Sequence, residues 1–166
     1  KIAAEVKRLE QTDFRGSLGI VTPFKQQANE ILLRLTTEVS TRFFERTRLV
    51  VETADGFQGD ERDVILFSLV AGSQLPPGCM HFLANSPNRF NVAVSRAKSL
   101  IHVFGDADWA GTCHISHIRE LYLAYEHSQG IRTDGLKSTL RRELIGPVWE
   151  PKFAVALEQA GISFEV

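Results

Sequence analysis

Residues 88–104 read NRFNVAVSRAKSLIHVF, a helical pattern that leads directly into an apolar run. At about 100° per residue, four apolar side chains share one face of a helix predicted over residues 88–98: Phe90, Ala93, Val94 and Ala97. Arg89 and Arg96 are seven residues apart, so they lie about 20° from one another on a different face. Taken alone, that second face is most simply a polar, solvent-exposed surface, and residues 100–104 are a buried strand.

The same alternation of strands and helices continues outward on both sides of this stretch. Apolar runs predict strands over residues 18–21, 49–53 and 64–70, and helical spacing predicts helices over residues 1–11, 26–35, 115–127 and 150–160. Residues 72–87 hold three prolines and two glycines, which favours a long surface loop. Strands that alternate with helices predict an α/β fold with a mainly parallel sheet.

A second informative stretch, DGFQGDERD at residues 55–63, lies between two of the predicted strands. Gly56 and Gly59 permit a close backbone approach or a positive φ. Gln58 and Glu61 are expected at the end of a strand, where open α/β sheets place groups that bind ligands. Without other information, the stretch would be read as a polar turn.

Composition narrows the function classes without naming one. The chain has 166 residues, a net charge of -1 and 43% hydrophobic residues, as in ordinary globular domains, and bulk charge does not indicate a nucleic-acid binder. No apolar run reaches membrane-spanning length, the charged start lacks a signal peptide, and Lys1 reads as a cut point. Two cysteines, Cys79 and Cys113, make no disulfide framework and favour the cytoplasm. Spacing disfavours a zinc site around Cys113, His114 and His117.

Three segments match ordered helicase motifs. The first is T-P-[YF]-x-x-Q, with Thr22, Pro23, Phe24 and Gln27; the second is T-x-D-x-F-Q-G-x-E-x-D, from Thr53 to Asp63; the third is N-R-x-N-V-A-x-[ST]-R-A, from Asn88 to Ala97. Over residues 15–106 the chain therefore resembles the second RecA-like domain (2A) of superfamily 1B helicases, the AAA_12-like branch of RNA-decay and DNA-replication helicases. The implied fold is RecA-like, of the P-loop NTPase type.

The resemblance implies roles for particular residues. In this family ATP, with Mg²⁺, binds between two RecA-like domains, and Arg96 matches the arginine finger. Glu61 and Gly59 match contacts to the sugar and γ-phosphate, and Gln58 is expected to couple the nucleotide to the nucleic acid. Arg89 is expected either at the nucleotide or in a pair with a carboxylate, such as Asp63 or Glu61, that orients the loop.

The same resemblance implies a nucleic-acid surface and two partners. Thr22, Pro23, Gln27 and Thr53 match positions at the nucleic-acid backbone, and such contacts fix register without reading sequence. The implied partners are a single strand, with DNA favoured over RNA, and the N-terminal RecA-like domain of the same protein. A domain separated from that neighbour would expose an apolar face and could self-associate.

The chain departs from the family in what it lacks. It contains no G-x-x-x-x-G-K-[ST] segment, no strand ending in a magnesium-binding acidic pair, and no Y-R-x-x-P element. We therefore expect that residues 1–166 alone do not hydrolyse ATP at a useful rate.

Residues after 128 change in character. We divide the chain into a RecA-like domain at 1–128, a linker at 129–146 and a last segment at 147–166. That last segment resembles the start of a very-short-patch-repair or restriction-like nuclease, in which Glu150 would match a metal-binding glutamate; its metal site would be incomplete here. The alternative is a terminal helix that packs on the first domain.

Two other functions remain open from the sequence. One is a degenerate RecA-like module that binds nucleic acid or protein without ATPase activity, although such a module has no chemical need for both Arg96 and Glu61. The other is a motor that serves a linked nuclease in defence or repair. Sequence upstream of Lys1 and downstream of Val166 would separate these hypotheses.

Overall fold

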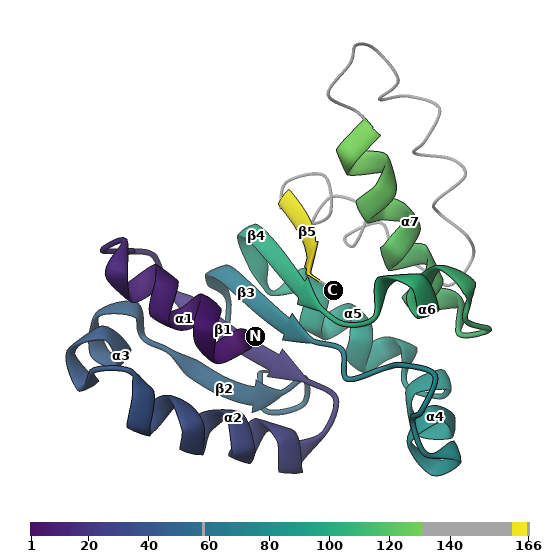
Figure 1. Cartoon of the computed structure of the whole chain (residues 1–166), viewed down its shortest axis with the longest axis horizontal. Helices are drawn as coiled ribbons and strands as arrows, with labels where there is room; N and C mark the ends of the chain where they lie inside the picture. Colours follow the sequence, from purple (N-terminus) through teal and green to yellow (C-terminus); the bar gives the residue numbers. More distant parts are fainter. Residues whose placement is uncertain (58, 131–160, 166) are drawn as a thin grey trace.

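A parallel sheet forms the centre of the fold. The computed structural model describes residues 1–57, 59–130 and 161–165, with side chains described up to residue 126. Within these residues, five strands pair in the order β2-β1-β3-β4-β5, and every pair is parallel (Figure 1). The strands are β1 (Leu18–Thr22), β2 (Val50–Thr53), β3 (Arg62–Ser68), β4 (Ala97–Phe104) and β5 (Gly161–Glu165). The predicted α/β fold with a parallel sheet is confirmed.

Seven helices accompany the strands in the described part of the chain. They are α1 (Ile2–Gln11), α2 (Lys25–Glu38), α3 (Thr41–Thr47), α4 (Pro77–Ala84), α5 (Pro87–Ser95), α6 (Ala107–Thr112) and α7 (Ser116–Gly130). The helices predicted near α1, α2, α5 and α7 are present. The helix expected over residues 150–160 lies outside the described residues.

The prediction of a long loop over residues 72–87 is wrong, because α4 lies inside it. Pro77 is the first residue of α4, where a helix needs no backbone N–H and the fixed φ of proline suits the first turn. The prolines therefore mark the beginnings of helices here. Two further short helices, α3 and α6, were not predicted, although side-chain caps begin both: Ser40 Oγ accepts from Phe43 N, and Asp106 Oδ1 accepts from Trp109 N.

Helix α5 ends earlier than its pattern predicts. The sequence suggested a helix through Lys98, but α5 stops at Ser95, Arg96 is its C-cap, and β4 begins at Ala97. The helical pattern ends here because Ala97 pairs with Arg62 of the neighbouring strand. Sheet pairing thus overrides local helical spacing at the position where Arg96 lies.

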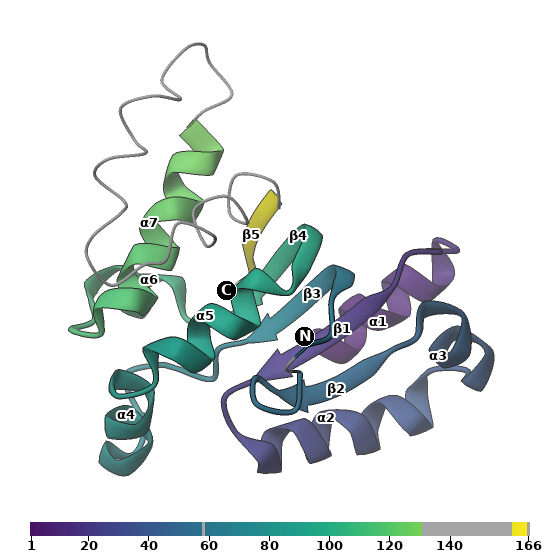
Figure 2. The ribbon, with the colours of Figure 1, turned by 180° about the vertical axis from the view of Figure 1, so that it is seen from behind.

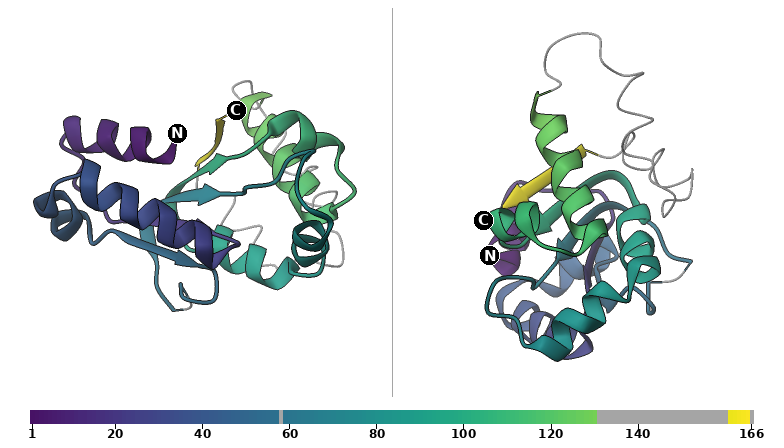
Figure 3. Two further views of the ribbon diagram at one scale, coloured as in Figure 1. Left: turned by 60° about the horizontal axis from the view of Figure 1, so that its bottom comes forward. Right: turned by 90° about the vertical axis from the view of Figure 1, so that its right-hand side faces the viewer.

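Helices cover both faces of the sheet. On one face, α1, α2 and α3 bury side chains against the sheet, where Leu18 and Ile20 of β1 and Leu66 of β3 belong to the same buried cluster. On the other, α4 to α7 pack against β3 and β4. Figures 1 and 2 show α1 and α5 on opposite sides, and the left view of Figure 3 shows the strands between them. Alternate residues of each strand serve alternate faces.

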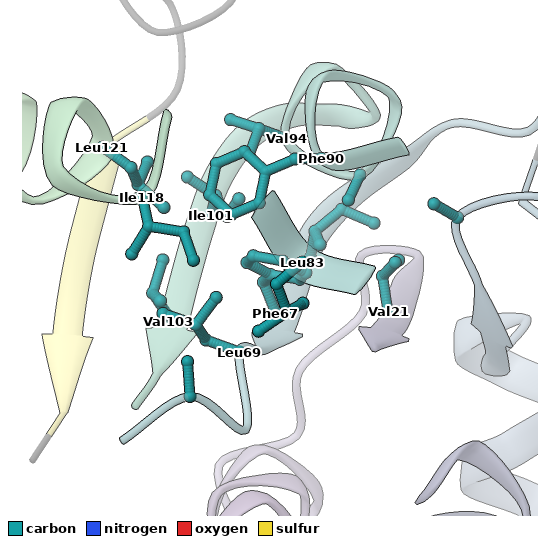
Figure 4. Close-up of a cluster of buried hydrophobic side chains, with 14 of the residues drawn as sticks. Val21, Phe67, Leu69, Leu83, Phe90, Val94, Ile101, Val103, Ile118 and Leu121 are labelled. Carbon is teal, nitrogen blue, oxygen red and sulfur yellow. The ribbon is translucent and has the colours of Figure 1, made fainter. Parts of the chain in front are cut away.

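The larger core cluster lies under α4, α5 and α7. Figure 4 shows Phe67 of β3 beneath Leu83 of α4 and Phe90 of α5, with Ile118 of α7 alongside. The rings of Phe67 and Phe90 meet edge to face, with centroids 5.2 Å apart. This packing fixes α5 on the sheet and therefore fixes both ends of α5, where Arg89 and Arg96 lie.

The connection from β2 to β3 crosses the sheet without a helix. The described residues 54–57 and 59–61 lead from the carboxyl end of β2 past β1 to the amino end of β3, and Phe57 is fully buried on the way. Its ring lies against Gly19 of β1: a Cβ placed on Gly19 would be 2.5 Å from Phe57 Cζ. Gly19 therefore leaves room for this short crossover.

The strand order reverses between β1 and β3. From β1 the chain moves through α2 and α3 to β2, whereas from β3 it moves the other way, through α4 and α5, to β4. The two sets of helices lie on opposite faces. Such a switch point opens a crevice at the carboxyl ends of the two strands, where open α/β sheets bind ligands.

The last strand joins the same sheet. β5 pairs with β4, with Ile101 opposite Ile162. Residues 131–160, which include most of the predicted linker and Glu150, lie outside the described residues. The predicted boundaries at 128 and 146 and the nuclease resemblance therefore stay predictions. None of the helices in the described part of the chain is long and apolar enough to cross a membrane.

Candidate nucleotide and nucleic-acid sites

Two residues predicted at the nucleotide lie side by side at the amino-terminal edge of the sheet. Glu61 directly precedes β3 and Arg96 directly precedes β4. The backbone N–H of Arg62 donates to the carbonyl of Arg96 at 3.0 Å, which ties the two segments together. Lys98 Nζ lies 3.9 Å from Glu61 Oε2. The end of α5, which carries Arg96, and the loop that carries Glu61 thus lie at the same edge of the sheet.

This edge is not the one that the sequence predicted. Glu61 was expected at the carboxyl end of a strand, but the helix-free crossover brings it to the amino end of β3. The pattern gave no sign of this, because a turn between two adjacent strands and a crossover between two parallel strands have similar length and polarity here.

The side chain of Arg62 fixes the loop that carries Glu61 from the buried side. Its side chain is largely buried, its Nε donates to the Arg48 carbonyl at 3.1 Å, and its Nη1 donates to the Glu61 carbonyl at 2.9 Å. Its Nη2 lies 3.3 Å from Asp60 Oδ2, and the guanidinium lies over the Phe57 ring. Arg62 therefore fixes the backbone of the segment that carries Glu61, a role that the sequence analysis missed. A single cation among Asp60, Glu61 and Asp63 was the available signal.

The side chain of Arg96 is half-buried and incompletely satisfied. Its Nε is buried, and the described residues offer it no hydrogen-bond partner. The Oδ1 atom of Asn91, on the preceding turn of α5, is in the same condition. Buried polar atoms are nearly always paired, so these two mark a place where a further group could bind.

Gly59 adopts a conformation that favours glycine. Its φ is +87°, and a Cβ placed on it would meet nothing within 4 Å. The restriction is therefore in the backbone and not in the surrounding space. Gly59 is exposed and lies two residues before Glu61, which is exposed as well. Gln58 lies outside the described residues.

Asp63 and Arg89 do not pair. Asp63 Oδ2 accepts from both the backbone N and the Oγ of Ser17, each at 2.7 Å, and these bonds lower the pKa of the Asp63 carboxyl. Arg89 instead donates through Nε to Asp55, at 2.8 Å to Oδ2. Arg89 therefore pairs with a carboxylate of this loop, as one of the two expectations allowed, but the partner is Asp55 and not Asp63 or Glu61. The cause is that α5 runs across the sheet, so Arg89 lies about 10 Å along the helix from Arg96.

The predicted nucleic-acid residues gather at the carboxyl edge of the sheet. Thr22 and Pro23 follow β1, and Thr53 ends β2. Together with Arg89 they line a pocket of about 330 Å³ at the switch point between β1 and β3. The structure thus groups Arg89 with the nucleic-acid residues rather than with Arg96.

Thr22 differs from its expected role in one respect. It is fully buried, and its Oγ1 donates to Gln27 Oε1 at 3.1 Å. Gln27 in turn donates through Nε2 to Ser68 Oγ at 2.7 Å. These bonds join the carboxyl ends of β1 and β3 through the start of α2. Thr22 and Gln27 therefore support the edge from within, while Pro23 and Thr53 are half-exposed.

The cysteine and histidine residues do not assemble into a metal centre in the described residues. No group of three or more metal-ligating side chains occurs there. Cys113 is buried and contacts the carbonyls of Ala110 and Ile115, and burial raises the pKa of its thiol. His117 packs edge-on against Phe90 in the core, and burial lowers the pKa of its imidazole.

Comparisons with known proteins agree with the motifs. A family model described as an AAA domain, AAA_12, matches residues 2–108. Helicase sen1 of Schizosaccharomyces pombe is 31% identical over 103 residues, which cover 62% of this chain and 6% of sen1. An ATP-dependent helicase of Mycoplasma genitalium, MG140, is 34% identical over 113 residues, covering 60% of this chain and 10% of that protein.

A third relative carries a DNA helicase name. The DNA polymerase alpha-associated DNA helicase A of Saccharomyces cerevisiae is 28% identical over 103 residues, covering 62% of this chain and 14% of the helicase. The chain therefore spans between 6% and 14% of the length of these three relatives. It is similar to one segment of a superfamily 1 helicase. That segment includes the candidate residues at both the amino and the carboxyl edge of the sheet.

Proposed function

The chain belongs to the AAA_12 family of AAA domains, and we propose that it is the second RecA-like motor domain of an ATP-dependent superfamily 1 helicase. In this role it supplies an arginine finger to an ATP site that it shares with an N-terminal RecA-like domain of the same protein. ATP hydrolysis then drives movement along a single strand, with DNA favoured over RNA. Residues 1–166 alone are inactive as an ATPase.

The observation that carries this proposal is that Arg96 and Glu61 lie in neighbouring segments at one edge of the sheet. The Arg62–Arg96 backbone bond of 3.0 Å holds the two segments together, and Arg62 fixes the loop. Arg96 keeps a buried Nε without a partner in the described residues. A guanidinium with such an unused donor suits a phosphate, because its planar fork can bind two phosphate oxygens at once.

The chemistry at this edge concerns charge. During phosphoryl transfer negative charge spreads over the transferred oxygens, and a positioned guanidinium stabilises it. Arg96 fills this role; Glu61 and Gly59 contact the sugar and γ-phosphate region, and Gln58 couples it to the nucleic acid. Mg²⁺ supplies further charge neutralisation, and its ligands lie in the N-terminal RecA-like domain.

The opposite edge binds the strand. Thr53 and Pro23 offer half-exposed surface at the switch point, and Thr22 and Gln27 hold that surface in place. Arg89, with its guanidinium exposed beside Asp55, belongs functionally to this edge. A domain that binds phosphates of two kinds at opposite edges of one sheet fits a motor better than a passive binding module.

The proposal is tested by Arg96→Ala in the full-length parent protein. Nucleic-acid-stimulated ATP turnover should fall about 10³-fold or more, because loss of an arginine finger has that effect. Arg42→Ala, which removes an exposed arginine from α3, is the matched control and should keep normal turnover. Circular dichroism and the melting temperature should match the wild type in both variants.

Normal turnover in the Arg96→Ala protein would remove Arg96 from catalysis. If the wild-type parent itself binds nucleic acid but does not hydrolyse ATP, the alternative of a degenerate RecA-like binding module replaces the motor. The two results are distinguishable: normal turnover in Arg96→Ala excludes a catalytic role for one residue, whereas absent turnover in the wild type excludes the motor function itself.

A further inference from the structure

The pocket at the switch point has an aromatic wall. Phe24 follows Pro23 at the start of α2, Phe82 lies on α4, and their ring centroids are 5.5 Å apart with an interplanar angle of 37°. Both side chains are half-buried, so each keeps part of its ring accessible, and both line the pocket. Two segments far apart in sequence thus present π surfaces to one cavity.

The floor of the pocket carries no charge. Phe67 and Phe90 lie there with His117, which is 4% exposed. Burial lowers the pKa of His117, against a smaller opposing effect of a hydrogen bond with the Leu83 backbone, so its surroundings favour the neutral imidazole. A floor of this kind suits a flat, uncharged group and disfavours a free phosphate.

Cations lie at the rim. Lys25 Nζ is 2.8 Å from Glu52, and Arg89 Nε is 2.8 Å from Asp55; both basic side chains are about half exposed or more. Exposed ion pairs of this kind contribute little stability, so a phosphate oxygen can replace the carboxylate at modest cost. The Arg89 guanidinium also lies 5.3 Å from the Phe82 ring centroid, which joins the cationic rim to the aromatic wall.

We propose that this pocket binds one unstacked nucleobase of a single strand, stacked on Phe82 and Phe24, while Arg89 and Lys25 contact the flanking phosphates. The inference rests on the proposed nucleic-acid function and adds a site to it. The aromatic wall suits a base, and the two exposed basic side chains at the rim suit the flanking phosphates. Stacking on an aromatic ring tolerates any base, so the site grips the strand without reading sequence.

The test compares a strand that has bases with one that lacks them. Fluorescence anisotropy would measure binding of the 166-residue chain to a 12-nucleotide oligo-dT and to an abasic oligonucleotide with the same backbone. We expect wild type to prefer oligo-dT by about tenfold, the scale of stacking one base. Phe82→Leu and Phe24→Leu should remove most of this preference and leave abasic binding unchanged. Phe82→Trp should restore it.

Two further variants separate stacking from charge. Arg89→Gln should weaken binding of both strands alike and reduce the slope of log affinity against log salt by about one, because it removes one phosphate contact. Phe44→Leu, a half-buried phenylalanine on α3 in the other core cluster, should leave both affinities unchanged. Thermal melts confirm that each variant is folded.

Each result supports or overturns the inference. Equal binding of oligo-dT and the abasic strand by wild type would overturn the base site and leave backbone binding intact. A folded Phe82→Leu protein with full preference for oligo-dT would do the same. Failure to bind either strand would overturn both this site and the nucleic-acid part of the proposed function, whereas the ATPase test of Arg96 would be unaffected.

Discussion

Arg62 shows how one buried cation can define a loop. Two of its nitrogens donate to main-chain carbonyls, at Arg48 and Glu61, and its guanidinium covers the ring of Phe57. Among the described residues, no other side chain donates hydrogen bonds to both of these carbonyls. The backbone position of Glu61 therefore depends on Arg62, although Arg62 itself faces inward.

We expect Arg62→Met to lower the free energy of unfolding by about 1–3 kcal/mol. The reason is that Met fills a similar volume but leaves the two carbonyls without their donor. Arg62→Lys should have an intermediate effect, because one ammonium cannot reproduce the forked geometry. Urea denaturation of the 166-residue chain would measure both values.

The matched control is Arg42→Met, at an exposed position on α3. Surface substitutions of this kind usually change stability by less than about 0.5 kcal/mol. Equal unfolding free energies for the Arg62→Met and Arg42→Met proteins would show that the bonds of Arg62 contribute nothing measurable to the fold.

At the scale of elements, the helix-free crossover between β2 and β3 is the most constrained feature. Gly19 and Phe57 occupy one space, so we expect Gly19→Ala to destabilise the chain by about 1–3 kcal/mol through overpacking. The new Cβ would lie 2.5 Å from Phe57 Cζ and 2.7 Å from Ile65 Cδ1. Thermal or urea unfolding would measure the loss.

A double variant tests whether Phe57 is the cause. Phe57→Leu should relieve part of the clash, so the two substitutions together should cost less than the sum of their separate effects. Gly78→Ala is the control: a Cβ there meets nothing within 4 Å, and alanine favours the helix α4. Strict additivity of Gly19→Ala and Phe57→Leu would place the strain elsewhere.

Elements also show what sequence can predict. Continuous apolar runs located the strands β1 to β4, because buried strands of a parallel sheet are apolar along their length. The pattern failed where pairing or proline chemistry decides the outcome: α4 begins at Pro77, and β4 takes Ala97 from the predicted helix. Short helices such as α3 depend on a single cap, which periodicity does not detect.

The candidate site divides in the same way. Motif order placed Glu61 and Arg96 in one site, and the structure brings their segments together. Sequence could not show that Arg89 lies with Thr53 instead, because the direction of α5 across the sheet is a tertiary property. The contribution of Phe82 was equally hidden, since it lies in a segment read as loop.

At the scale of the whole molecule, two edges of one sheet carry two sets of groups. Arg96 and Glu61 lie at the amino edge, Thr53 and Arg89 lie at the carboxyl edge, and α5 spans the distance between them. Phe67 of the central strand β3 packs on α5 through Phe90. A rigid element thus connects the proposed nucleotide edge to the proposed strand edge, as the proposed motor would require.

The proposed division of labour between two domains leads to the last prediction. The chain contains no G-x-x-x-x-G-K-[ST] loop, and its groups at the amino edge are one half-buried guanidinium and an exposed acidic loop. Phosphate binding at full strength needs backbone N–H groups of a glycine-rich loop and a lysine. We therefore expect the 166-residue chain to bind Mg-ATP with a Kd weaker than about 1 mM, corresponding to a binding free energy of about -4 kcal/mol or less in magnitude.

Isothermal titration calorimetry with Mg-ATP would measure this affinity on the wild-type chain and on the Arg96→Ala chain. Both titrations should give little heat, because we propose that Arg96 contacts the triphosphate only when ATP is bound to a neighbouring domain. Micromolar binding by the wild type that is lost in Arg96→Ala would show that this edge forms a complete nucleotide site by itself. The shared-site proposal would then have to be abandoned, even though the fold and family would stand.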